Sequence, residues 1–294
     1  MKAEKLVLKC EMLDVIKASL TLIRPDLSIA AGICVLTGQL LALGEMSTPI
    51  QALAGFFSVA MISGAILALN DCLDVASDMI NAPRRPIPSG MISLKAAYAI
   101  AVTLFIAGLG LSAVTGLLSL AAGVVLAIVG ILYNWKFKKT GLPGNLMVSF
   151  SVGMTFVYGG ITVGLPFEKT VLFFGLLAAA LDLGEEIAAD AMDMEGDKEI
   201  NSNSIAIKFG KEMALRISSG IFAFVVLLTI VPFVLGWFRP VYLIPFIVMD
   251  VIIFYAVKSL IRSKSDEGRG YVKWIYRGST AAILAFLVIR LAGV

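Results

Sequence analysis

The chain has 294 residues, of which 59% are hydrophobic and 15% are charged, and its mean hydropathy is +0.93. In soluble domains about a quarter of all residues are charged, so this composition excludes an ordinary soluble protein. It predicts an all-α polytopic membrane protein. The chain contains no histidine, which excludes imidazole as a metal ligand or general base, and its net charge is only +3. We expect no nucleic-acid partner.

Long apolar segments follow one another from the N-terminal region to the end of the chain, each of about the length that crosses a bilayer. We expect nine transmembrane helices, at approximately 18–43, 50–70, 93–114, 117–134, 145–164, 168–189, 212–236, 240–260 and 275–292. The loops after the even-numbered spans are charged, and those after the odd-numbered spans are short and nearly neutral.

Basic residues lie mostly on one side of these predicted spans. The opposite loops contain only Lys169 and Arg239, with Arg290 close to the C-terminus. Because cytoplasmic loops carry an excess of Lys and Arg, the N-terminus and the even-numbered loops are predicted to be cytoplasmic and the C-terminus extracytoplasmic. We therefore expect a multi-pass protein of the cell membrane that contacts the lipid bilayer along its length.

Two acidic clusters of matching spacing close the second and sixth predicted spans. They consist of Asn70, Asp71, Asp74 and Asp78, and of Asp190, Asp193 and Asp197. Aspartates at i, i+3 and i+7 share one face of a helix, which predicts two trios of carboxylates near the membrane edge. Mg²⁺ is usually held by a few carboxylates together with substrate phosphates, so the trios predict a site for about two or three Mg²⁺ ions that bridge a diphosphate.

The clusters also mark a weak internal repeat. The chain, residues 1–294, is predicted to form a single transmembrane domain with two four-helix units, about 15–134 and 145–260, and an extra helix at 275–292. Four spans separate the clusters, so the two units have the same orientation and form a parallel repeat about an axis along the membrane normal. Such an axis would bring the clusters face to face across a central cavity.

Basic and polar residues at the same membrane edge are the candidates for binding the phosphates of a substrate, because guanidinium and ammonium groups donate to phosphate oxygens. The candidates are Arg24, Arg84, Arg85, Tyr133, Lys136, Lys138, Asn145 and Lys198. Arg24 is predicted to lie within the first apolar helix, at the wall of the cavity. Two other interpretations stay open: Arg84 and Arg85 as an anchor under the positive-inside rule, and some of the lysines as contacts to lipid headgroups.

The two clusters resemble known motifs. Asn70-Asp71-x-x-Asp74-x-x-x-Asp78 resembles the first aspartate-rich motif of the UbiA-type intramembrane prenyltransferases, and Asp190-x-x-Asp193-x-x-x-Asp197 resembles the second. The segments 85–90 and 133–138 are also similar to that superfamily. Within it, segments 186–197 and 204–210 are most similar to the archaeal digeranylgeranylglyceryl phosphate synthases.

The resemblance implies an enzyme that transfers a polyprenyl group, here geranylgeranyl, from its diphosphate to a lipid acceptor, with Mg²⁺ as cofactor. The implied acceptor is geranylgeranylglyceryl phosphate, in archaeal ether-lipid synthesis, and the implied catalytic residues are Asp71, Asp190 and Lys138. Two alternatives stay open. One is prenylation of an aromatic acceptor in a quinone, haem or chlorophyll pathway, and the other is a cation-coupled transporter, since intramembrane acids and parallel repeats occur there too.

Overall fold

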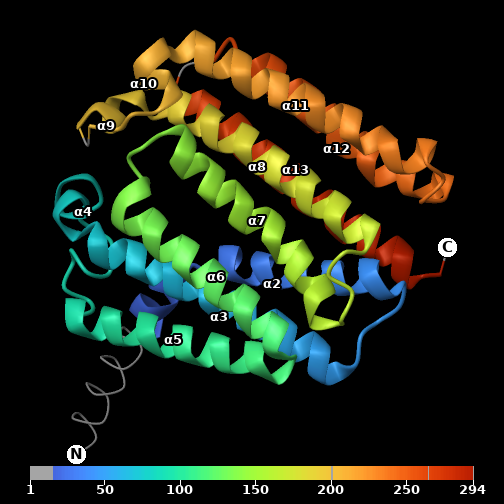
Figure 1. The fold of residues 1–294 in the computed structure, drawn as a ribbon. Helices are drawn as coiled ribbons and strands as arrows, with labels where there is room; N and C mark the ends of the chain where they lie inside the picture. Colours follow the sequence, from blue (N-terminus) through green and yellow to red (C-terminus); the bar gives the residue numbers. More distant parts are fainter. Residues whose placement is uncertain (1–15, 200, 264, 294) are drawn as a thin grey trace, which may run out of the picture.

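The computed structural model describes residues 16–199, 201–263 and 265–293, and these residues form helices and connecting turns without a strand (Figure 1). The long helices are α2 (Pro25–Leu43), α3 (Pro49–Leu73), α5 (Leu94–Val114), α6 (Leu117–Leu132), α7 (Leu142–Thr162), α8 (Lys169–Met192), α11 (Lys211–Val234), α12 (Leu243–Leu260) and α13 (Ser265–Leu291). The short helices are α4 (Val75–Asn81), the π-helix η1 (Tyr133–Phe137), α9 (Met194–Glu199), α10 (Ile205–Phe209) and the 3₁₀ helix η2 (Pro240–Tyr242).

Eight of these described helices are long and apolar enough to cross a membrane. The sixth predicted span, 168–189, is not among these eight and corresponds to α8, which is equally long but carries Asp182, Glu185 and Glu186 in its second half. Acids at that depth are costly in lipid unless they face the interior of the bundle. The prediction of an all-α polytopic membrane protein is confirmed, whereas the exact number of nine spans stays a prediction.

The first predicted span, 18–43, was wrong in one respect, because its helix breaks at Arg24. Residues 16–23 are helical, Arg24 adopts a left-handed backbone conformation with φ 42°, and α2 begins at Pro25. Proline disfavours the helical conformation of the residue before it and cannot donate a hydrogen bond back along the chain. Arg24 therefore lies at a helix junction, where its side chain is free to point away from the lipid.

The last helix also differs from its predicted bounds, since α13 begins at Ser265 rather than near residue 275. Its first turns are polar and include Arg269 and Lys273. The apolar segment that defined the prediction is only the second part of this helix. α13 therefore carries charged residues toward the end of the bundle where α8 finishes.

The helices pack in the same succession in both halves of the chain. α2 packs on α3, α3 on α5 and α5 on α6, while α7 packs on α8, α8 on α11 and α11 on α12. α2 and α7 join the halves, and Gly38 and Gly159 allow this close approach: a Cβ on Gly38 would lie 2.1 Å from the carbonyl oxygen of Phe156. The division into units of about 15–134 and 145–260 stays a prediction.

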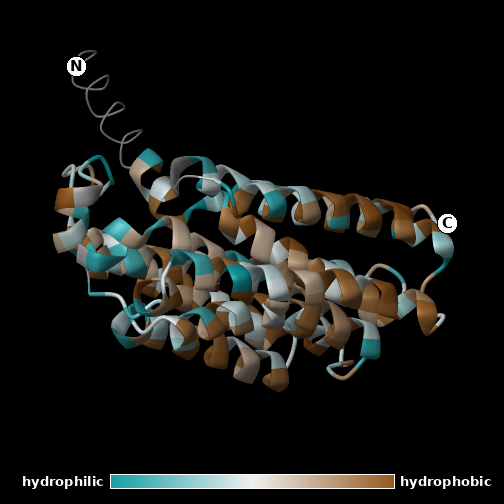
Figure 2. Cartoon of the chain, turned by 90° about the horizontal axis from the view of Figure 1, so that it is seen from above, coloured by the Kyte–Doolittle hydropathy of each residue, from teal (hydrophilic) through white to brown (hydrophobic). Residues whose placement is uncertain are grey.

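The short helices that follow the acidic clusters lie at one end of the bundle. α4 follows α3 and α9 follows α8, and both are on the left in Figure 1, opposite the C-terminus. In Figure 2 hydrophilic residues gather toward the end of the bundle opposite the C-terminus, and hydrophobic residues dominate along the long helices. The fold thus places both predicted clusters at the same polar end of an apolar bundle.

Candidate functional site

Each acidic cluster lies where a long helix gives way to a short one. Asp74 separates α3 from α4, with φ −91° and ψ 3°, and Asp193 separates α8 from α9, with φ −106° and ψ 15°. Their amide groups still donate to Asn70 and Ala189, both at 3.0 Å. The three aspartates of each trio therefore do not share one continuous helix, because the middle aspartate occupies the sparsely populated bridge conformation at a junction.

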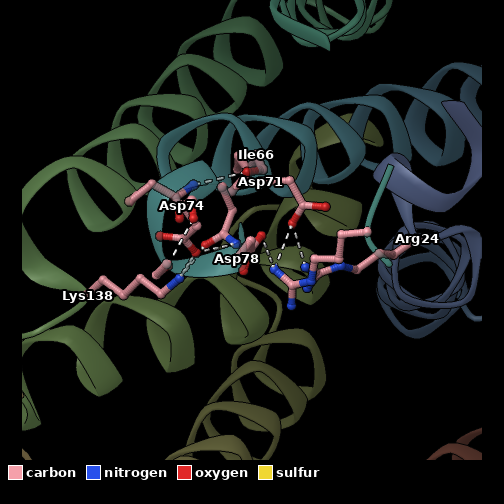
Figure 3. A network of polar contacts seen from close by, with 10 residues as sticks. Arg24, Ile66, Asp71, Asp74, Asp78 and Lys138 are labelled. Carbon is pink, nitrogen blue, oxygen red and sulfur yellow. Dashed lines mark hydrogen bonds and ion pairs between the residues drawn. The ribbon is translucent and has the colours of Figure 1, made fainter. Parts of the chain in front are cut away.

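Asp71 and Asp78 of the first cluster are neutralised by two arginines (Figure 3). Asp71, 3% exposed, accepts hydrogen bonds from Arg24 at 2.8 Å and Arg85 at 3.4 Å, and Asp78 accepts one from Arg85 at 2.7 Å. Burial lowers the pKa of Arg85, but the neighbouring Asp78 and Asp71 outweigh it and raise that pKa overall. Arg85 therefore stays cationic and links the two ends of the trio.

Asp74, the middle residue of this cluster, pairs with Lys138 (Figure 3). The ammonium group also donates to Asn70 Oδ1 at 2.9 Å, and Asn70 Nδ2 donates to Asp74 at 3.1 Å. Lys138 directly follows the π-helix η1, which Asn134 ties to α3 by donating to the carbonyl oxygen of Ile66 at 3.0 Å. A π-helical turn often occurs at functional sites, and here it delivers Lys138 to the cluster.

The second cluster has fewer cationic partners. Asn145 on α7 donates to Asp190 at 2.9 Å, and Arg269 on α13 pairs with Asp193. Asp197 Oδ2 is buried and has no hydrogen-bond partner, and burial raises the pKa of this carboxyl group. An unpaired buried carboxylate oxygen is costly, so this half of the site favours a cationic ligand.

Further acids lie deeper in the second half of the bundle and face other helices. Ser149 on α7 donates to Asp182 at 2.9 Å, and Thr229 on α11 donates to Asp250 at 2.9 Å. Glu185 Oε1 is buried without a hydrogen-bond partner. These acids point toward the protein interior, as expected for carboxylates within a membrane bundle.

The π-helix η1, which carries Tyr133, packs on both α3 and α7. α3 carries the first cluster, and α7 carries Asn145, which donates to Asp190 of the second cluster. Together with the position of α4 and α9 at one end of the bundle, these contacts indicate that both clusters border the same region (Figure 1).

The structure separates the predicted phosphate ligands into two groups. Arg24, Arg85, Lys138 and Asn145 contact the acidic clusters. The side chains of Arg84, Lys136 and Lys198 are exposed and form no ion pair within the described part of the chain. Arg269 was not among the predicted site residues, because it is 76 residues from Asp193 and no local spacing relates the two.

The donor set fits a hard divalent cation in its chemistry. The clusters supply only carboxylate and amide oxygens, which Mg²⁺ prefers, and Asp197 offers a buried oxygen without a partner. Among the described residues no three acidic or thiol groups converge at metal-binding distance. The carboxylates instead face Arg24, Arg85, Lys138 and Arg269, so a metal would have to replace some of these contacts.

A model of the UbiA prenyltransferase family matches residues 31–276. The chain belongs to the UbiA prenyltransferase family. It is 32% identical to the digeranylgeranylglyceryl phosphate synthase of Natronomonas pharaonis over 279 residues, which cover 94% of this chain and 98% of that protein. Membership confirms the predicted resemblance to this family, and the protein is accordingly an intramembrane prenyltransferase and a multi-pass membrane protein.

Solved structures share this fold. A structure reporting on digeranylgeranylglyceryl phosphate synthase in membranes matches with a TM-score of 0.78 and 30% identity, covering 95% of this chain and 99% of that chain. A UbiA homolog from Archaeoglobus fulgidus, bound to GPP and Mg²⁺, matches with a TM-score of 0.69 and 18% identity, covering 94% of this chain and 99% of that chain. The arrangement of helices is therefore that of the UbiA fold.

Proposed function

We propose that this protein transfers a geranylgeranyl group from its diphosphate to the free hydroxyl of geranylgeranylglyceryl phosphate, a step of archaeal ether-lipid synthesis, with Mg²⁺ as cofactor. The observation that carries the proposal is the pairing of a buried aspartate cluster with Arg24, Arg85 and Lys138 beside a second cluster that lacks comparable compensation. The relative from Natronomonas pharaonis that spans 94% of the chain bears the name of this synthase.

We infer that oxygen atoms of both clusters bind about two or three Mg²⁺ ions. The ligands we propose are Asn70, Asp71, Asp74, Asp78, Asp190, Asp193 and Asp197. Bound Mg²⁺ supplies positive charge to the departing diphosphate. The A. fulgidus homolog with the same fold is bound to GPP and Mg²⁺, which supports this assignment.

The basic residues would exchange carboxylate for phosphate when substrate binds. Lys138 and Arg85 are held beside the cluster by Asp74 and Asp78, so they are already positioned to donate to diphosphate oxygens. Charge-assisted hydrogen bonds of this kind are shorter and stronger than neutral ones. They stabilise the negative charge that develops as the bond between the prenyl carbon and the diphosphate oxygen breaks.

The second half of the reaction needs a group that accepts a proton. The acceptor hydroxyl oxygen forms the new ether bond with the prenyl carbon and releases its proton. We propose that Asp190 accepts it through a carboxylate oxygen that is not bound to Mg²⁺, because Asn145 holds this side chain in place and it pairs with no Lys or Arg in the described part of the chain. Water must be kept out, since it competes for the allylic cation, and the apolar bundle around the site serves this purpose.

The distribution of Lys and Arg also orients the enzyme. We propose that the N-terminus and the site face the cytoplasm and that the C-terminus is extracytoplasmic. Both lipid substrates would then reach the site from the bilayer, with their phosphate groups at the cytoplasmic headgroup level. A thiol label introduced at Lys198→Cys should be accessible only from the cytoplasmic side.

An assay of the purified full chain tests the proposed reaction. Labelled geranylgeranyl diphosphate and Mg²⁺ are incubated with geranylgeranylglyceryl phosphate or with an aromatic acceptor, and the products are identified. We expect a labelled diether only with the glycerol phosphate. Alkylation of the aromatic compound alone would move the enzyme to the alternative pathway, and metal flux into proteoliposomes without any prenyl transfer would favour a transporter.

A further inference from the structure

A basic pocket lies at the end of the bundle opposite the acidic clusters. Its volume is about 300 Å³, and Gly44, Trp237, Arg239, Tyr242 and Arg290 are among the residues that line it. They come from the end of α2, from the connection between α11 and α12, and from the last turn of α13. This pocket is separate from the proposed catalytic site.

The pocket gathers basic residues that the sequence places opposite the clusters. Arg239 and Arg290 line it, and the ammonium group of Lys169 lies 5.3 Å from the ring centroid of Trp237, also in its lining. In the described part of the chain neither arginine forms an ion pair with an acid. Glu168, which precedes Lys169 in the chain, caps α8 by accepting from the amide groups of that helix at 2.6 and 3.3 Å.

Arg290 has an unsatisfied donor in this pocket. Its Nε is buried and has no hydrogen-bond partner, which is costly for a charged group. Gly44 provides the room for this guanidinium: a Cβ there would lie 3.3 Å from Nη2, and the backbone has φ +77°, which suits glycine. The structure therefore keeps two arginines without an acidic partner among the described residues at one pocket, although this side of the predicted spans carries few basic residues.

We propose that this pocket binds the phosphate group of a membrane lipid headgroup. Guanidinium groups donate to phosphate oxygens in a fork, and a phosphate in the pocket would neutralise Arg239 and Arg290. The pocket lies where α2, α11 and α13 end, beside Trp237, and tryptophan favours the headgroup level of a bilayer. Its volume is at the lower limit for ligand pockets, so it suits a headgroup and leaves the acyl or prenyl chains outside.

The fluorescence of Trp237 provides a direct test. The chain has three tryptophans, so Trp135→Phe and Trp274→Phe leave Trp237 as the only one. The full-length protein in detergent is titrated with dihexanoylphosphatidylglycerol, with dihexanoylglycerol, which lacks the phosphate, and with inorganic phosphate. We expect a saturable change with the phospholipid alone, and an increase of about 10-fold in its Kd for Arg239→Gln and for Arg290→Gln.

Two control variants separate binding from a purely structural role. Arg216→Gln removes an exposed arginine of α11 that pairs with Glu212, and it should leave the Kd unchanged. Arg290→Lys keeps the positive charge near the end of α2, so the variant should retain thermal stability. It should lose the forked contact to phosphate and therefore bind the phospholipid more weakly. Arg239 is exposed, so its variant provides the affinity measurement even if Arg290→Gln fails to fold.

The outcomes are distinct. The proposal would be overturned if Arg239→Gln bound the phospholipid as tightly as the parent protein does. It would also be overturned if the parent bound dihexanoylglycerol as tightly as the phospholipid. Binding of inorganic phosphate as tight as that of the phospholipid would identify the free ion as the ligand and overturn the lipid assignment. Prenyl transfer should be unaffected in Arg239→Gln, since the pocket lies at the other end of the bundle.

Discussion

Replacing Lys138 by alanine tests the link between the first cluster and the diphosphate. Lys138 is the lysine of its segment that reaches the acids: it pairs with Asp74 and donates to Asn70 Oδ1 at 2.9 Å. Lys136 and Lys139, on the same segment, are exposed. If the ammonium group transfers its hydrogen bond from carboxylate to phosphate, its removal should weaken productive binding of the prenyl donor.

The expected size of the loss in kcat/KM follows from the solvent exposure of the Lys138–Asp74 pair. The side chains of Lys138 and Asp74 are 29% and 22% exposed, so solvent screens the contact partly. A hydrogen bond to a charged group contributes about 1.5–3 kcal/mol, and partial screening favours the lower limit. A loss of about 1.5 kcal/mol corresponds to about a 10-fold decrease in kcat/KM for the donor.

Steady-state transfer of labelled geranylgeranyl diphosphate, with donor and acceptor varied in turn, measures this effect. Lys138→Ala should lower kcat/KM for the donor and leave the KM of the acceptor unchanged. Lys136→Ala is the matched control, and we expect less than about a twofold change from this exposed residue. A selective rise in the acceptor KM, or equal effects of both variants, would refute the assignment of Lys138 to the diphosphate.

Three further predictions concern the metal and the packing of the bundle. Asp74→Ala and Asp193→Ala should each reduce transfer at least about 100-fold by removing a metal ligand, and near-normal activity in either would reject the metal site. Chelation of divalent ions with EDTA should stop transfer and added Mg²⁺ should restore it, measured in the same product assay; transfer that persists in EDTA would exclude a metal requirement. Gly38→Ala should lower the free energy of unfolding by about 1–3 kcal/mol, because its Cβ would lie 2.1 Å from a carbonyl oxygen of α7. The loss of the helical circular dichroism signal during unfolding in detergent measures this change. Gly220→Ala, where an added Cβ meets no atom within 4 Å, is its control and should be neutral or stabilising; similar losses in both would show that α2 and α7 do not pack this closely.

Local patterns in the sequence were sufficient for the fold class and for the acidic clusters. The length of each apolar segment decides whether a helix can cross the bilayer, and this property needs no knowledge of neighbouring helices. The spacing of Asp71, Asp74 and Asp78 is likewise local, and it recurs at Asp190 to Asp197. Even the break at Arg24 has a local cause in Pro25, although the predicted span ran through it.

Only the tertiary structure decided which basic residues meet these acids. Arg24 is 47 residues from Asp71, Lys138 is 64 residues from Asp74, and Arg269 pairs with an acid on another helix. Arg84 and Arg85 are adjacent and chemically identical, yet of these two arginines only Arg85 bonds the first cluster in the described part of the chain. Such choices depend on how α3, α8 and α13 pack and on which way each side chain points, and no periodicity along the chain encodes those distances. The sequence by itself therefore determined the membrane helices and the acids, and the packing of those helices selected the acids' cationic partners.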